Sequence, residues 1–465
     1  MSEFRQAQHD KNCQPELVEG GIYNQDQREA MKPKKWGIVG GGMMGMTLAH
    51  RLAQQGHEVT IFEAAPDLGG LVSSWKMNGV EWDKFYHVIL LSDFRTRNVL
   101  KEIGLEDKTH WVETKTGFYM NGQLYSMSDT IEFLKFPTLN LIDKFRLGLT
   151  IIVASRIKNW KKLENVPVTK WLKRWSGSNT YNKIWLPLLR AKLGDSYERT
   201  SAVFIWATIQ RLYGARKSGL KKEMFGFVDG GYKTVIESFK QTLINEGVKI
   251  KTGQMASEVK QDTNGKPSIS FSNAETESFD EVISTLPSPL SARLCKGLSE
   301  NEVQRLNNVE YLGVMCVAVL LDRKISDFYV TNITDSWVPF TGVIEMSALV
   351  DKKYLGGNSL VYLPKYVSPT DPLFSQTDDE IKTYFISNFK KMYPSLTDDN
   401  IKFVGVARAK HVITVLTKGY SDNLPGVKTS IPGVSIVNTS YIQDGTLNVN
   451  ETIRVAETKL EEILK

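Results

Sequence analysis

The stretch from Lys35 to Gly70 constrains the fold of this chain more than any other feature. It opens with a short apolar run, Trp36 to Val39, of the kind that forms a buried parallel strand. A glycine-rich turn over residues 40–45 follows, and the residues after it repeat with helical periodicity. A second apolar run ends at Glu63. The order of strand, glycine turn, helix and strand predicts a βαβ unit within a parallel sheet.

Each glycine of this turn has its own role in the binding of a dinucleotide. Gly40 permits the tight turn, Gly42 lets the backbone approach a pyrophosphate, and Gly45 lets the helix pack closely on the strand. The helix then points its unpaired N–H groups and positive dipole end at the phosphates. At the end of the second strand, the Glu63 carboxylate accepts hydrogen bonds from ribose hydroxyls and repels the 2′-phosphate of NADP. A glycine-rich surface turn would not explain Glu63, so the pattern predicts a dinucleotide site.

Length and composition narrow the remaining classes of function. The 465 residues are enough for two or more domains, and a net charge of +6 is far from the strongly basic balance of a nucleic-acid-binding protein. Three scattered cysteines (Cys13, Cys295, Cys316) form no C-x-x-C pair, and no H-x-x-x-H spacing occurs. We therefore expect a reducing compartment, no structural zinc and no metal site.

The N-terminal segment and the length of the apolar runs indicate the cellular location that we expect. Residues 1–33 are polar and lack the apolar core of a signal peptide, so we expect a disordered leader, or an upstream extension if Met31 is the true start. No apolar run reaches the roughly 18 residues that a membrane-spanning helix needs. We expect a cytoplasmic protein, either free or in peripheral contact with the inner membrane face.

Features of a nucleotide-binding domain recur in three separated blocks, at residues 34–95, 225–290 and 401–465. Two inserts lie between them: residues 96–224 are expected to be mostly helical, and residues 291–400 to mix strands with helices. The sequence thus predicts an α/β fold in which a discontinuous Rossmann-like domain is interrupted twice by a mixed cap or substrate domain. Among the individual elements we expect strands at Glu281–Thr285, Val314–Leu321, Arg408–Val415 and Val434–Asn438, and helices at Tyr232–Glu246, Asp378–Met392 and Asn450–Lys465.

A second glycine pair, Gly69-Gly70, follows Glu63 closely. With this pair the pattern resembles the FAD-dependent superfamily of amine oxidases, protoporphyrinogen oxidases and phytoene-type desaturases, of which UDP-galactopyranose mutases are more distant members. The resemblance runs from Lys35 to the C-terminus and includes Gly230-Gly231. Phe85-Tyr86-His87 and residues 185–194 further resemble a subgroup of bacterial oxidoreductases. The resemblance implies FAD as the cofactor and a GR2-type FAD-binding fold.

The resemblance also assigns residues to parts of the cofactor. It places Gly69 and Gly70 near the flavin, where only a bare backbone lets the chain close on a flat ring. Two positions depart from the family pattern: Leu71 stands where many relatives have Arg or Lys, and Asn438 where many have Gly-Asp. The residues predicted to contact FAD are Gly40, Gly42, Met43, Met44, Gly45, Glu63, Gly69, Gly70, Leu71, Val259 (beside adenine), Thr285 (near the ADP half), Asn438 and Asn448 (at the start of the last helix).

The implied activity is that of an FAD-dependent oxidoreductase of the oxidase or desaturase type, similar to protoporphyrinogen oxidase. It would remove a hydride at flavin N5 from an extended, partly apolar or lipid-like substrate and pass the electrons to oxygen or a quinone-like acceptor. Candidate catalytic side chains are His87, Lys192 and Tyr420, and His411 is a further candidate for lining the site. Each has a plain structural alternative: a hydrogen-bonded histidine, a solvated charge on a helix, or core packing.

Other functions stay open beside the leading one. A non-redox isomerase of the UDP-galactopyranose mutase type would be active only with reduced flavin. A flavin-free prenyl or lipid carrier on the same fold would have no physical need for the intact glycines and Glu63. An NAD dehydrogenase with a simple Rossmann fold does not account for Gly69-Gly70.

The basic run from Arg156 to Arg174, with the cluster of Arg216, Lys217, Lys221 and Lys222, also has alternatives. Three interpretations are open: a solvated face over a packed helix, an amphipathic helix on a membrane surface, or a source of positive electrostatic potential that attracts a phosphorylated substrate.

Overall fold

The computed structural model describes residues 32–128, 130–214 and 224–465. Residues 1–31 of the expected leader and the basic cluster from Arg216 to Lys222 lie outside the described residues. Everything reported below belongs to the unit formed by residues 34–465.

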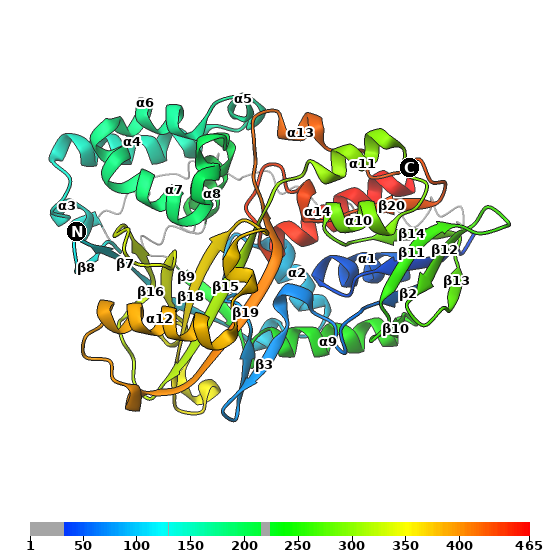
Figure 1. The fold of residues 1–465 in the computed structure, drawn as a ribbon, viewed down its shortest axis with the longest axis horizontal. Helices are drawn as coiled ribbons and strands as arrows, with labels where there is room; N and C mark the ends of the chain where they lie inside the picture. The colour runs from blue at the N-terminus through cyan, green and yellow to red at the C-terminus, as the bar shows by residue number, and fades with distance from the viewer. Residues whose placement is uncertain (1–31, 129, 215–223) are drawn as a thin grey trace, which may run out of the picture. The chain divides into compact units, whose positions relative to one another are not determined.

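A five-stranded parallel sheet gathers strands from distant parts of the chain (Figure 1). Its order is β10-β2-β1-β14-β20, and every neighbouring pair in it is parallel. The strands are β1 (Lys35–Val39), β2 (Glu58–Phe62), β10 (Lys249–Lys251), β14 (Glu281–Ser284) and β20 (Val434–Ile436). The first strand therefore lies at the centre, where the strand order reverses and ligands of such sheets bind. The predicted α/β class and the discontinuous Rossmann-like sheet are confirmed.

Successive side chains of the central strands point to opposite faces of the parallel sheet, which lies between a layer of helices and a second, antiparallel sheet. Ile38 and its neighbours pack with the helices α1 (Met43–Gln54), α9 (Gly231–Asn245) and α14 (Val449–Leu464). Val39 faces the other way, against the antiparallel sheet of β11 (Ala256–Gln261), β12 (Pro267–Phe271) and β13 (Thr276–Ser278). Because both faces are covered, these strands are apolar on both sides, as expected for a buried parallel sheet.

A seven-stranded sheet forms the second large body of the fold, in the order β19-β15-β18-β17-β16-β7-β8. Its pairs are antiparallel except β16 with β7. The helix α12 (Asp378–Met392) packs against β15 and β19. The strands are β7 (Lys115–Met120), β8 (Gln123–Ser126), β15 (Tyr311–Leu321), β16 (Phe328–Ile333), β17 (Gly342–Glu345), β18 (Ser359–Val367) and β19 (Ile401–Thr414).

Residues 96–224 are mostly helical, as expected, but they also contain β7 and β8 of this sheet, and β6 (Thr109–Glu113), which pairs with β9 (Met224–Val228). The turn between β7 and β8 is Asn121-Gly122, both with positive φ, which is a local hairpin signal that the expectation overlooked. One expectation is corrected: strand β19 pairs with β15, so the chain returns to the parallel sheet only at β20 and not at residue 401. Long-range strand pairing decides the structure there, and local periodicity does not report it. Smaller pieces are the hairpin of β3 (Ser74–Met77) and β4 (Val80–Asp83), and β5 (Ile89–Leu90), which pairs with β9.

The remaining part of the first insert is helical. It contains α3 (Thr130–Lys135), α4 (Leu141–Arg156), α5 (Lys161–Glu164), α6 (Val168–Thr180), α7 (Leu186–Leu193) and α8 (Val203–Gly214). In Figure 1 α4, α6, α7 and α8 form one cluster, coloured cyan to green. The basic run from Arg156 to Arg174 is not one helix, because α4 ends where it begins and α5 and α6 follow as separate helices. Pro167 stands immediately before α6, where a proline ends continuous helix.

Candidate cofactor and active site

The amino end of α1 forms an open anion site. Its N-cap is Gly42, no side chain caps the helix, and its first turn carries no acidic residue. A Cβ atom at Gly42 would have only the Gly69 carbonyl oxygen nearby, at 3.9 Å, so space is free beside this backbone. The side chains of Met43 and Met44 are buried, which leaves their backbone N–H groups at the helix start. Such a terminus binds phosphate through N–H groups and the helix dipole.

The other two glycines of the turn are required by close packing. Gly40 has φ +111°, and a Cβ there would lie 2.3 Å from Thr285 Oγ1. A Cβ at Gly45 would lie 2.0 Å from the Gly40 carbonyl oxygen. The Thr285 hydroxyl donates to the Val39 carbonyl at 2.9 Å, which ties β14 to the turn.

Glu63 lies at the carboxyl end of β2, directly beside the glycine turn. Its carboxylate accepts one hydrogen bond from the Gly41 N–H at 2.7 Å and another from the Ala65 N–H at 2.8 Å. These two bonds hold the half-buried carboxylate at the sheet edge, with acceptor capacity left for a further ligand. The arrangement fits a ribose placed between the second strand and the phosphate site.

The second glycine pair lies against the first. The Gly69 N–H donates to the Gly41 carbonyl at 2.9 Å, and Gly42 and Gly69 form an isolated parallel bridge. Gly69 and Gly70 both have positive φ, at +128° and +57°. A Cβ at Gly69 would lie 2.6 Å from the side-chain atom Ile236 Cδ1, on a backbone whose positive φ already disfavours a side chain. The two glycine segments thus form one continuous edge, which suits a long cofactor such as FAD.

Three other predicted cofactor contacts lie on different elements, and several of their polar groups are engaged within the protein. Val259 is fully buried on β11, and its carbonyl accepts from Lys296 N–H at 2.8 Å. The buried Asn438 donates to the Leu286 carbonyl and accepts from Ser440 N–H, both at 2.9 Å. Asn448 caps α14 by accepting from Glu451 N–H at 3.0 Å. Contacts of these residues with FAD stay predictions.

Beyond the second glycine pair, an aromatic cluster forms between the glycine edge and the seven-stranded sheet. We use the term aromatic cluster for Leu71, Tyr86, Tyr362, Tyr366 and Leu447, which share one apolar core. Leu71 follows Gly70, and Leu447 precedes α14, so both segments that the resemblance places at the flavin contribute to this apolar core. The hydroxyls of Tyr86 and Tyr366 lie 2.8 Å apart.

Lys192 reaches this cluster from α7. Its Nζ lies 3.6 Å from the centre of the Tyr366 ring. Burial lowers the pKa of Lys192 to about 7, and among the described residues no carboxylate offsets that effect. Its amine is therefore available in the neutral form near physiological pH, unlike a solvated lysine.

His87 lies in a separate small cavity, lined in part by Trp82, Phe227 and Tyr232. Its Nδ1 is 3.7 Å from Oδ2 of Asp83, and its ring centre is 5.0 Å from that of Tyr232. Burial raises the pKa of Asp83, while contact with His87 lowers it in part. Tyr362 of the aromatic cluster donates to the Asp83 carbonyl, so the cavity and the cluster adjoin.

The remaining candidates lie elsewhere. Tyr420 is buried and donates to the Ser440 carbonyl at 2.8 Å, which is a packing role. His411 stacks edge-on against Tyr311, and burial lowers its pKa. Sequence reasoning missed Tyr366 as a site residue, because its partner Tyr86 is 280 positions away and no local signal joins them.

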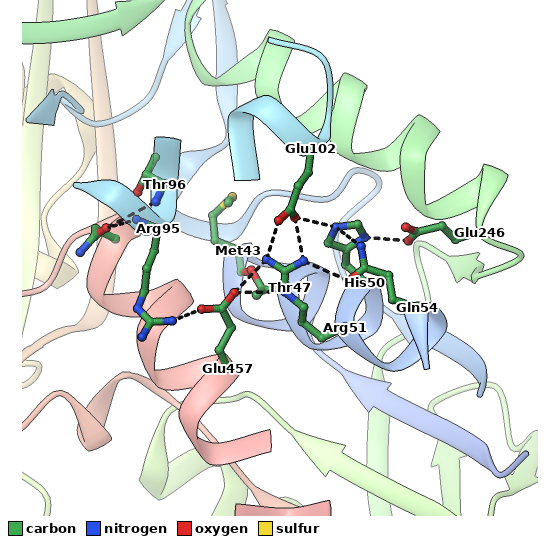
Figure 2. A network of polar contacts seen from close by, with 11 residues as sticks. Met43, Thr47, His50, Arg51, Gln54, Arg95, Thr96, Glu102, Glu246 and Glu457 are labelled. Atoms are coloured by element: carbon green, nitrogen blue, oxygen red, sulfur yellow. Dashed lines mark hydrogen bonds and ion pairs between the residues drawn. The ribbon is translucent and has the colours of Figure 1, made fainter. Parts of the chain in front are cut away.

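A polar network behind the phosphate site fixes α1 to its neighbours, as Figure 2 shows. His50 lies between Glu246, 2.7 Å from its Nδ1, and Glu102, 3.0 Å from its Nε2. Arg51 pairs with Glu102 and with Glu457 of α14. Burial opposes a charge on His50, but the hydrogen bonds to the two carboxylates raise its pKa overall. The network therefore ties the phosphate-binding helix to α9, α14 and α2 (Phe94–Glu102).

Comparisons with known proteins agree with this geometry. The family model for flavin containing amine oxidoreductases matches residues 43–430. The 15-cis-phytoene desaturase of an Oncidium hybrid cultivar is 22% identical over 79% of this chain, which spans only 66% of that protein. The zeta-carotene desaturase of Synechocystis sp. is 22% identical over 88% of this chain and 92% of its own length. The crystal structure of an oxidoreductase from Methanosarcina mazei, 19% identical, covers 92% of this chain and all of its own with a TM-score of 0.71, a likeness of fold.

Proposed function

The chain belongs to the flavin containing amine oxidoreductase family, and we propose that it removes a hydride from an extended, partly apolar substrate at N5 of bound FAD. FAD is its cofactor, and the enzyme is an FAD-dependent oxidoreductase. Bound FAD supplies the hydride acceptor. Oxygen or a quinone-like compound is the proposed final acceptor of the electrons.

The residues at the glycine edge fit the cofactor. Backbone N–H groups at the start of α1 would hold the pyrophosphate, and Glu63 would hold the adenosine ribose. The Gly69-Gly70 backbone would lie beside the ring, because it leaves no side chain in the way.

The observation that carries the proposal is the position of the Lys192 amine on the aromatic cluster. Tyr86 and Tyr366 are both half-buried, and desolvation raises the pKa of Tyr86 to about 12, so it keeps its proton. Lys192 lies on the face of Tyr366. Apolar walls of this kind favour a substrate with little charge along the part that they enclose.

Lys192 has a proposed role in the reaction. Loss of a hydride from one substrate carbon, coupled to formation of a double bond, leaves a proton to be removed from a neighbouring atom. Nζ of neutral Lys192 would accept that proton, and the pKa of about 7 suits a base at neutral pH. Tyr86 and Tyr366 would orient the substrate by packing against it.

Two measurements test the proposal. The purified protein should show flavin absorbance, or take up FAD on titration; absence of both contradicts the assigned cofactor. Candidate substrates are then added anaerobically: isoprenoids, porphyrinogens, amines and nucleotide sugars. One of the apolar classes should bleach the absorbance of the bound flavin. Turnover of a nucleotide sugar only after chemical reduction of the flavin, with no bleaching by any candidate, would favour the isomerase alternative.

A further inference from the structure

Helix α4 carries apolar side chains on its outer face as well as on its buried face. Leu141, Ile142, Phe145 and Ile152 are exposed to 75, 71, 72 and 43%. Spacings of four, seven and four residues place one set of side chains along a single side of the helix: Leu141, Phe145, Ile152 and the exposed Arg156. The opposite side is buried. Contiguous exposed apolar side chains of this kind mark an interaction surface, so this outer face calls for an apolar partner.

The charges around this face have one sign. Residues 131–183, which the structure describes throughout, contain eleven Lys and Arg but only three acidic residues, whereas the whole chain has a net charge of +6. None of the three acidic residues is exposed: Glu132 is half-buried, and Asp143 and Glu164 are buried. The exposed basic residues of this stretch are Lys135, Arg156, Lys158, Lys161, Lys162, Lys170, Lys173, Arg174 and Lys183.

We propose that the outer face of α4, flanked by Lys135, Arg156 and Lys158, docks on the surface of an anionic lipid bilayer. Apolar side chains enter the boundary between headgroups and acyl chains, while Lys and Arg contact the anionic headgroups. No helix in the described part of the chain is long and apolar enough to cross a membrane, which limits this contact to the interface. The inference does not depend on the proposed reaction.

Charge decides between a bilayer and a second copy of this chain. If two α4 faces met in a symmetric dimer, their basic residues would be brought together without exposed acidic partners from this stretch. Such an arrangement is repulsive at low ionic strength, whereas an anionic membrane attracts the same residues.

Co-sedimentation of the full chain with vesicles tests the proposal. We expect binding to vesicles of phosphatidylcholine and phosphatidylglycerol, much weaker binding to phosphatidylcholine alone, and a decrease with added salt. The double variant Ile142→Glu/Phe145→Glu should lower the partition coefficient at least about tenfold, because two charges replace the inserted side chains. A matched control is Ile244→Glu/Met255→Glu, which changes two exposed apolar residues elsewhere (48 and 59% exposed) and should leave binding unchanged.

A second double variant tests the contribution of the basic residues separately from that of the apolar side chains. Arg156→Glu/Lys158→Glu should remove the preference for anionic vesicles while flavin content and circular dichroism stay as in the parent protein. The proposal is overturned if the parent chain binds neither vesicle, or if the α4 variants bind as the control does. It is equally overturned if light scattering shows a dimer that dissociates in the α4 variants, since the face would then join two copies.

Discussion

Gly42 and Gly45 are three residues apart in one turn, yet the structure predicts opposite consequences when each is replaced by alanine. At Gly42 the backbone has φ −77° and a Cβ would meet only one atom, at 3.9 Å. The Gly42→Ala apoprotein should therefore fold normally, because the roughly 0.4–1 kcal/mol gained from a less flexible unfolded chain is offset by the lower preference for alanine than for glycine at an N-cap. The new methyl group would instead occupy the space through which a pyrophosphate approaches the N–H groups of α1.

The expected loss of FAD affinity follows from those N–H groups. A hydrogen bond to a charged group contributes about 1.5–3 kcal/mol. Displacement of the phosphates from two of them should cost about 3–6 kcal/mol, which raises Kd by about 10²- to 10⁴-fold. Quenching of flavin fluorescence on titration of the apoprotein measures Kd, and a thermal melt without FAD measures the fold.

Gly45→Ala supplies the contrast. Its Cβ would lie 2.0 Å from a backbone oxygen, so the turn or the helix must move, and overpacking of this kind costs about 1–3 kcal/mol in the apoprotein itself. Wild-type FAD affinity in Gly42→Ala would refute the assignment of the phosphate site to this helix terminus. An unchanged melting temperature in Gly45→Ala would refute the argument from close packing.

Three further predictions concern single side chains. Lys192→Met should slow flavin reduction by about 10²-fold and abolish the rise of its rate through pH 7, because Nζ is the proposed proton acceptor; an unchanged pH profile measured by stopped flow would exclude that role. The pKa of His50 is raised in the folded protein, so its stabilising contribution is complete below the unfolded pKa and disappears as pH rises through the folded pKa. The difference in melting temperature between the parent protein and His50→Gln should accordingly be larger at pH 6 than at pH 9, and a difference that is independent of pH would argue against an imidazolium between Glu102 and Glu246. Glu63→Gln should weaken FAD binding by about tenfold while leaving the apoprotein melt within about 1 kcal/mol, and equal affinity for FAD in isothermal titration would remove Glu63 from the ribose site.

The parts of the fold that the sequence predicted well depend on local chemistry. The glycine turn, β1 and α1 follow from spacing within twelve or so residues, and the helix at Asp378–Met392 begins at a capping box of Thr377 and Glu380. Strands β7 and β8 were missed although they form a hairpin around Asn121-Gly122, which is a local turn signal. The pairing of β7 with β16, about 200 positions later, has no such signal. No periodicity within residues 96–224 carries information about that partner.

The candidate site also divides into a part that local sequence predicts and a part that only tertiary packing creates. Gly42, Gly69 and Glu63 lie within 30 residues, and the structure brings them together. Lys192 was a candidate on the sequence, but its unusual acidity comes from burial against Tyr366, which only tertiary packing creates. A single amphipathic helix over Arg156–Arg174 was one of three alternatives for the basic run, and the structure divides that run among α4, α5 and α6. The exposed apolar side chains lie on α4, and only the folded structure shows which of its faces is open.

The last strand and helix of the chain complete the first sheet. Strand β20 pairs with β14, and α14 packs on α1 with Ile453, Ala456 and Leu460 in the shared core. During synthesis the glycine turn at residues 40–45 and the pair Gly69-Gly70 leave the ribosome hundreds of residues before β20 and α14 are made. We therefore expect FAD to bind late in biogenesis, because a nascent chain that stops short of residue 434 retains every glycine of the predicted phosphate site without the support that holds its helix in place.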